Sequence, residues 1–177
     1  MVNNFIFKPR PSIYTCHPLS FSHLQLTPCR EGAYPPADSA RATDCKYKSF
    51  VVLSDQFNPP QFGRASLNEY CDGLQAWFPY GGDEHHKEDF LVLRSGDCQK
   101  FYWARVRQVH KKPNAYELVK HGQQSPAVMA GILGKAHVAE LQGWISNDGE
   151  EKGVSQEEVL DGLVLCIKDR DCSEHAH

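Results

Sequence analysis

Apolar residues along this chain fall in short runs bounded by residues typical of turns. Phe50-Val51-Val52-Leu53 leads into a loop with Pro59 and Pro60, and Phe90-Leu91-Val92-Leu93 leads into Ser95-Gly96-Asp97. Runs of this length between turn signals are typical of buried strands. We therefore expect one strand at each run.

A longer run of aromatic and basic residues, Lys100 to Val109, follows the second of these strands. The segment between them has the chemistry of a tight turn, so residues 90–93 and 100–109 are predicted to pair as a β-hairpin. Alternate residues of the second strand share a face, and neither face is purely apolar. The pattern leaves the buried face undecided, and a return strand is expected at 116–120.

Two serines are followed three residues later by a glutamate, which is the capping-box pattern of a helix N-terminus. Ser66 with Glu69 predicts a short helix from Leu67 to about Trp77. Ser155 with Glu158 precedes apolar residues at helical spacing, and it predicts a C-terminal helix that reaches about Ile167.

Residues 1–46 hold six of the eleven prolines, and proline disfavours long helices and central strands. We expect an irregular wrap there around an α+β core at 47–177, with the whole of 1–177 as one domain. Residues 122–146 could form strands or a weak helix, and no internal repeat is evident.

The composition is that of a globular protein. Of its 177 residues 41% are hydrophobic and 23% are charged, and no apolar run is long enough to span a membrane. Nineteen Lys and Arg against 22 Asp and Glu give a net charge of -3, so binding of nucleic acid would need a local basic patch.

Seven cysteines are scattered along the chain instead of clustering in metal-binding pairs. They are Cys16, Cys29, Cys45, Cys71, Cys98, Cys166 and Cys172. This scatter favours long-range disulfides of undetermined pairing, with at least one thiol left over, in a secreted protein whose signal peptide has been removed. A cytosolic protein with seven reduced cysteines is the alternative.

Candidate catalytic and metal-binding groups are sparse in pattern, although the chain has nine histidines. The densest cluster, Asp83 to Asp89, lacks the spacing of a known metal motif and is expected to be a solvated loop, so no metal and no cofactor is predicted. A hydrolase or ribonuclease-like site could combine His110 with Glu117 or His121, beside Arg107 or Lys120.

The most distinctive local feature is the run from Lys100 to Arg107, which combines three aromatic residues with three basic ones. Such a strand could stack bases and contact phosphates through Trp103, Arg105 and Arg107. The alternative is that its aromatic side chains pack in the core while the arginines extend to solvent or pair with carboxylates.

Trp103, Arg105, Val106 and Arg107 resemble the Trp-Arg-[Phe/Leu/Val]-[Arg/Lys] signature of the LARS family, secreted cysteine-rich avirulence effectors of plant-pathogenic fungi, with Ala104 inserted. The resemblance implies an antiparallel sheet of about four strands with helical connections, stapled by disulfides. It also implies no catalytic residues and a role in plant immune recognition.

Three functions remain open. The first is a secreted, monomeric, non-enzymatic effector that binds a host protein through Trp103, Arg105, Arg107 and the exposed loop residues His85 and Asn147. The second is the small secreted hydrolase or toxin with a histidine–carboxylate pair. The third is a nucleic-acid-binding module, which the acidic net charge disfavours.

Overall fold

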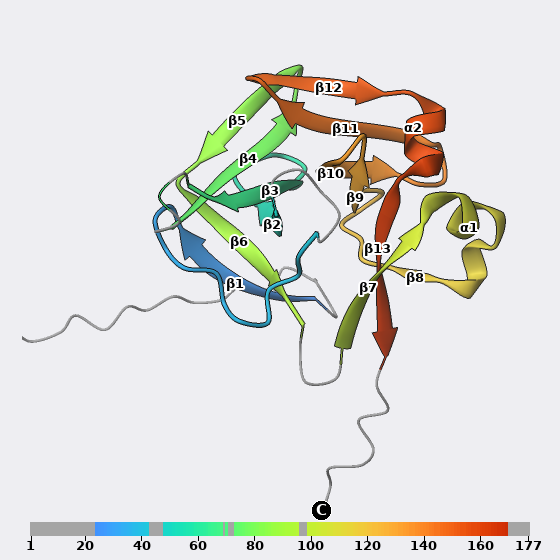
Figure 1. Cartoon of the computed structure of the whole chain (residues 1–177), viewed down its shortest axis with the longest axis horizontal. Helices are drawn as coiled ribbons and strands as arrows, with labels where there is room; N and C mark the ends of the chain where they lie inside the picture. Colours follow the sequence, from blue (N-terminus) through green and yellow to red (C-terminus); the bar gives the residue numbers. More distant parts are fainter. Residues whose placement is uncertain (1–23, 43–47, 69, 71–72, 96–98, 170–177) are drawn as a thin grey trace, which may run out of the picture.

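The computed structural model describes residues 24–42, 48–68, 70, 73–95 and 99–169. Within them the chain forms thirteen strands in one curled, antiparallel sheet (Figure 1). The first six strands are β1 (Gln25–Arg30), β2 (Phe50–Ser54), β3 (Gln61–Leu67), β4 (Leu74–Tyr80), β5 (Asp83–Lys87) and β6 (Asp89–Arg94). The others are β7 (Gln99–Arg105), β8 (Glu117–Leu118), β9 (Ser125–Met129), β10 (Ile132–His137), β11 (Gln142–Asn147), β12 (Glu150–Val154) and β13 (Leu163–Asp169).

Helical structure in the described residues is limited to three short segments. They are α1 (Val106–Lys111), the 3₁₀ turn η1 (Pro113–Ala115) and α2 (Gln156–Asp161). The predicted α+β fold with about four strands and a long C-terminal helix is therefore wrong. No helix in this part of the chain is long and apolar enough to cross a membrane.

The predicted helix at 67–77 is wrong because the apolar residues there bury with a period of two. Leu74, Ala76 and Phe78 of β4 are fully buried on one side of the sheet, which is the pattern of a strand. The expected loop at 83–89 contains β5 for a related reason, since it pairs with β4 in register from Ala76–Lys87 to Tyr80–Asp83.

The capping box of Ser155 and Glu158 is confirmed, with Ser155 Oγ accepting from the Glu158 N–H at 3.3 Å. The helix that it starts ends at Asp161, and the apolar residues that follow form β13. The strand at 50–53 is confirmed as β2. The hairpin of 90–93 with 100–109 is wrong, because β6 pairs with β1 and β2 whereas β7 pairs with β13.

Disulfides are absent from the described residues. Cys29 and Cys166 are free thiols, and the other five cysteines lie outside the described residues. The predicted disulfide-stapled fold is therefore wrong. Three apolar cores hold the described strands together instead.

The order of the strands in the sheet reads as two copies of one six-stranded arrangement placed end to end. Its order is β1-β6-β2-β3-β4-β5 followed by β12-β11-β10-β9-β13-β7. Counted from the two ends towards the centre, each strand of the first half has a counterpart in the second half. β5 and β12 meet at the centre, at Asp83 and Glu150. The two halves are thus related by an approximate two-fold axis.

The sequence carries the same duplication in weak form. Gly63-Arg64-Ala65 in β3 corresponds to Gly134-Lys135-Ala136 in β10, and Leu74-Gln75-Ala76-Trp77 corresponds to Leu141-Gln142-Gly143-Trp144. An internal repeat therefore exists that sequence analysis missed, since the matching residues are few and separated by loops of different length.

Three apolar clusters follow from this symmetry. One belongs to the first half, around Phe78, and one to the second half, around Ile145. The third cluster takes corresponding residues from both halves, among them Leu93 with Leu165 and Phe62 with Leu133. The two halves consequently share a core.

Candidate interaction site

Among the described strands, β7 forms one end of the sheet and pairs with β13 on one side only. The Val106 N–H donates to the Gly162 carbonyl at 3.0 Å, which fixes the alternation of hydrogen bonds along the pair. The backbone groups of Phe101, Trp103 and Arg105 consequently point away from β13. The Arg105 carbonyl is the exception, because Arg105 is the N-cap of α1 and its carbonyl accepts the first hydrogen bond of that helix. The other groups have no backbone partner in the described part of the chain.

The corresponding strand at the other end of the sheet, β1, lacks one outward N–H because it contains a proline. The Glu31 N–H donates to the Glu88 carbonyl at 2.7 Å, so the backbone of residue 28 points outward from the sheet. Pro28 has no N–H to offer there. Arg105 occupies the equivalent place in β7 and keeps its N–H, so the two edges differ in what they can bind.

A groove lies against β7 at Lys100, Phe101 and Trp103. Its volume is about 360 Å³, which is within the size of ligand sites. It is lined by residues 39–41, Ser95, Lys100, Phe101, Trp103 and Leu165. The groove therefore offers apolar side chains next to outward backbone groups.

Four exposed basic residues surround this edge, and we call them the basic edge: Arg41, Lys100, Arg105 and Lys168. Lys100 and Lys168 stand opposite each other on β7 and β13, and no carboxylate of a described residue lies within 4 Å of either. Like charges in that position weaken a strand pair. An anionic partner would relieve the repulsion.

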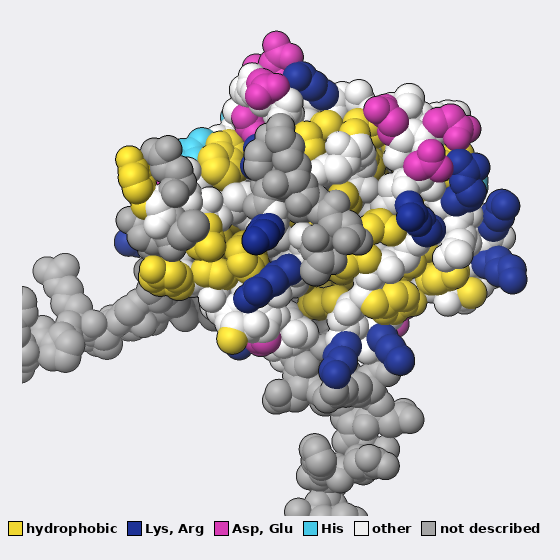
Figure 2. Space-filling model, in the orientation of Figure 1, with side chains coloured by type: hydrophobic (Ala, Val, Ile, Leu, Met, Phe, Trp, Pro, Cys, Tyr) yellow, Lys and Arg dark blue, Asp and Glu magenta, His cyan; other side chains and the backbone are white. Residues whose placement is uncertain are grey.

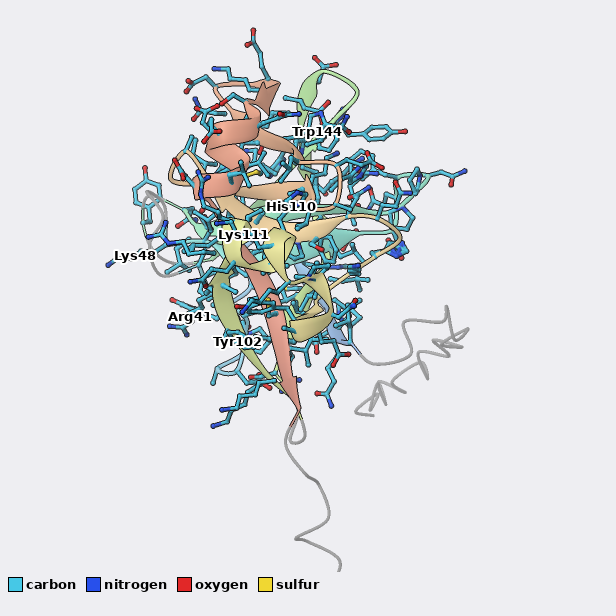
Figure 3. All side chains as sticks on the ribbon, turned by 90° about the vertical axis from the view of Figure 1, so that its right-hand side faces the viewer. Arg41, Lys48, Tyr102, His110, Lys111 and Trp144 are labelled. Atoms are coloured by element: carbon cyan, nitrogen blue, oxygen red, sulfur yellow. The ribbon has the colours of Figure 1, made fainter. Side chains whose placement is uncertain are left out.

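The charges of the molecule are separated in space despite the small net charge. Figure 2 shows Lys and Arg side chains over β7, β13 and α1, and Asp and Glu side chains over β12 and α2. Figure 3 shows Arg41 and Lys48 on the same side of the molecule, with Tyr102 of β7 beside them. The basic edge thus belongs to a wider positive surface.

The structure brings three of the predicted binding residues close to this site. Trp103 is half-buried, and its Nε1 donates to the Arg41 carbonyl at 2.7 Å. Arg105 donates to the Asp161 carbonyl at 2.9 Å, and Arg107 pairs with Asp161 and Glu157 at 2.9 and 3.1 Å. The arginines therefore also hold α2, and the hydrogen bond to Asp161 helps to raise the pKa of Arg107.

His85 and Asn147 lie elsewhere, near the turns where the two halves meet, and both are half-buried rather than exposed. The His85 ring packs against Phe57 with centroids 5.4 Å apart, and its Nε2 lies 3.0 Å from the Tyr80 carbonyl. Asn147 bonds to the Asp148 carboxylate. Their role in binding remains a prediction.

A pair of buried ion pairs marks the junction of the halves, and sequence analysis missed it. Arg64 pairs with Glu84 at 3.0 Å, and its symmetry equivalent Lys135 pairs with Glu151 at 3.3 Å. Lys135 also donates to the Gln61 side chain and the Pro79 carbonyl. Burial lowers the pKa of Lys135, although Glu151 partly offsets this. The repeated Gly-[Arg/Lys]-Ala was the available signal.

The carboxylates of these pairs also join the two central turns. Glu84 accepts from the Gly149 N–H at 2.9 Å, and Glu151 accepts from the Gly82 N–H at 2.8 Å. Each half thus holds the turn of the other with the same residue type.

The residues suggested for a hydrolase are only partly gathered. His110 and Lys120 line a cleft beside α1, together with His137, whereas Glu117 and His121 do not line it. Burial lowers the pKa of His121. Among the described residues no three His, Cys, Asp or Glu side chains are grouped as metal ligands.

Comparison with known proteins gives one family and a similar fold. Residues 29–169 match the family described as MFP2b, cytosolic motility protein. The crystal structure of the nematode sperm cell motility protein MFP2B is similar, with a TM-score of 0.71 at 19% identity. The similarity covers 84% of this chain and 45% of that one, so this chain spans less than half of that relative. No curated protein sequence matches.

These matches overturn the predictions built on a secreted effector. The resemblance to the fungal LARS family rested on five residues, whereas the motility family covers most of the chain. A cytosolic family also contradicts secretion, a plant-immune role and a host partner. Neither the family nor the fold supports the hydrolase or toxin.

Proposed function

The chain belongs to the family of the cytosolic motility protein MFP2b, and from that premise we propose that it is a non-catalytic assembly module of a motility apparatus. It binds an extended, acidic segment of another protein, which adds as a strand to the outer edge of β7. The observation that carries this proposal is a strand edge that no described strand pairs with, next to basic residues that form no ion pair with a described carboxylate.

Strand addition explains the combination of features better than charge alone. The outward backbone groups of Phe101 and Trp103, with the N–H of Arg105, supply hydrogen bonds that an added strand needs. The groove beside them accepts alternate side chains of that strand. Lys100 and Lys168 then select acidic residues over basic ones.

A second copy of this chain is a poor occupant of the same edge. Pairing of β7 with β7 of another copy would bring Lys100 and Arg105 of both copies together, and like charges at an interface disfavour association. An acidic partner avoids this cost.

The test uses a fluorescent peptide with alternating valine and glutamate, measured by anisotropy with the full chain. We expect saturable binding that weakens as salt is raised, because exposed charges are screened. The same peptide with lysine in place of glutamate should not bind, and a peptide with alternating prolines should bind at least tenfold more weakly because proline removes strand donors.

The matched protein variants are Arg105→Pro and Arg105→Ala. Arg105 has φ -64° and its N–H has no partner among the described residues, so proline fits there as Pro28 does in β1. We expect R105P to lose tenfold or more of the affinity and R105A to lose much less. Equal loss in the two variants, or tight binding of polyuridylate at the same surface, would contradict strand addition.

A further inference from the structure

The second half of the molecule has a cleft beside α1, with a volume of about 420 Å³. Its origin lies in one difference between the two halves. Phe50 pairs with Ala65 in the first half, and Ser125 pairs with Ala136 at the equivalent place in the second. The Phe50 ring is 5% exposed and lies beneath Arg41, whereas Ser125 leaves the corresponding space unfilled.

The floor of the cleft carries a polar group that nothing in the protein satisfies. Ser125 is 1% exposed, and its Oγ has no hydrogen-bond partner among the described residues. A buried hydroxyl without a partner is costly, so it points to a ligand that accepts its hydrogen bond.

Lys120 lines the cleft with Ser125 and supplies a positive charge. It occupies the place that Arg41 has in the first half. The preceding residue, Val119, donates its N–H to the carbonyl of Leu165, and Ala40, which precedes Arg41, donates to the carbonyl of the counterpart Leu93. Arg41 covers a phenylalanine there. Lys120 has no carboxylate of a described residue within ion-pairing distance, so its charge is available.

Two histidines and a glutamate also line the cleft. His110 Nδ1 lies 3.3 Å from the Val138 carbonyl, to which it must donate because a carbonyl only accepts. His137 Nδ1 lies 3.6 Å from the Glu140 carboxylate and is buried without a hydrogen-bond partner among the described residues. Its ring packs edge-on against Trp144, with ring centroids 5.0 Å apart. Figure 3 looks onto this side of the molecule, with His110 near its centre. The cleft therefore contains two buried polar atoms, Ser125 Oγ and His137 Nδ1, that have no hydrogen-bond partner among the described residues.

The walls of the cleft are apolar and come from Val109, Pro113, Tyr116, Leu118 and Val138. We propose that the α1 cleft binds a ligand with an apolar body and a single carboxylate, the carboxylate accepting from Ser125 Oγ and pairing with Lys120. A leucine at the free C-terminus of a protein and a small aliphatic acid share this chemistry. The site lies on different residues from the basic edge, so it stands or falls independently of the proposed function.

The first measurement titrates the isotope-labelled full chain with N-acetyl-leucine and follows amide shifts by NMR. We expect saturable shifts concentrated at the residues that line the cleft. N-acetyl-leucinamide, which has the same body without the charge, should bind at least tenfold more weakly. Equal binding of acid and amide, shifts centred elsewhere, or no saturable binding would overturn the proposal.

The variants use the symmetry of the molecule. Ser125→Phe installs the residue of the first half and should fill the cleft, so binding should be lost while cooperative unfolding is kept. Ser125→Ala removes the hydroxyl alone and should weaken binding, and Lys120→Met should weaken it about tenfold. If S125F fails to fold, K120M carries the test, because Lys120 is exposed. Wild-type affinity in K120M would overturn the proposal.

A hexapeptide ending in leucine separates the two sources of the carboxylate. Binding more than tenfold tighter than that of N-acetyl-leucine supports the C-terminus of a partner protein as ligand, and comparable binding supports a small acid. The hexapeptide with an amidated C-terminus is the control. Undiminished binding of that amide would count against the site.

Discussion

At the scale of single residues, the centre of the molecule depends on charges held away from water. Lys135 and Glu151 have side chains that are 7% and 11% exposed, and Arg64 and Glu84 form the equivalent pair. Burying a charge is tolerable only with a partner and hydrogen bonds, which the Gln61 side chain and the Pro79 carbonyl provide for Lys135.

Glu151→Gln should lower the free energy of unfolding by about 3 kcal/mol or more, because Lys135 keeps its charge without a carboxylate. Urea unfolding measures the change. The control is Asp148→Asn, which removes the exposed pair of Asp148 with Lys152, 3.8 Å long, and should cost less than about 1 kcal/mol. Equal losses of unfolding free energy in the two variants would show that the buried ion pair stabilises the protein no more than the exposed pair does.

His121 should make stability depend on pH. Its pKa in the folded protein lies below the usual value because it is partly buried, so the unfolded chain binds more protons as the pH falls below about 6.5. The stability is therefore full above that pH and is lost as the pH falls through the folded-state pKa. Urea midpoints between pH 7.5 and 5 should fall less steeply in His121→Gln, and identical slopes would contradict this role.

At the scale of elements, patterns between neighbours in sequence predicted some helices and strands correctly. They failed where pairing with a strand distant in sequence determines the secondary structure. The strand at β2 and the cap of α2 depend on neighbours in sequence, and both were predicted. Leu163–Ile167 fits a helical stripe equally well, and only pairing with β7 and β9 makes it a strand. Ser66 and Glu69 likewise matched a helix start that the pairing of β3 with β4 overrides.

The candidate site was predictable in part for the same reason. Trp103 and Arg105 were placed on a strand with mixed faces, which is correct. That no described strand covers its outer edge could not be predicted, because its partner β13 was expected to be a helix. The unfilled position at Ser125 becomes visible only when its counterpart Phe50 is known.

At the scale of the whole molecule, the two halves share a central core, so neither should fold alone. Residues 1–98 and 99–177 expressed separately should each lack a cooperative unfolding transition. Each fragment would hold only part of the shared apolar cluster, which contains Leu93 from one half and Leu165 from the other. Mixing the two should restore it, as seen by circular dichroism. A cooperative transition in either fragment alone would show that the halves are independent.

The difference between Pro28 and Arg105 at the two ends of the sheet has a consequence for stoichiometry. A molecule able to accept a strand at both ends could act as a link and be incorporated into an endless ribbon. If strand addition occurs at β7 and the loss of one donor at Pro28 prevents it at β1, the molecule has a valence of one. It would then bind its partner at a ratio of one to one. It would end a series of strand-addition contacts instead of extending the series.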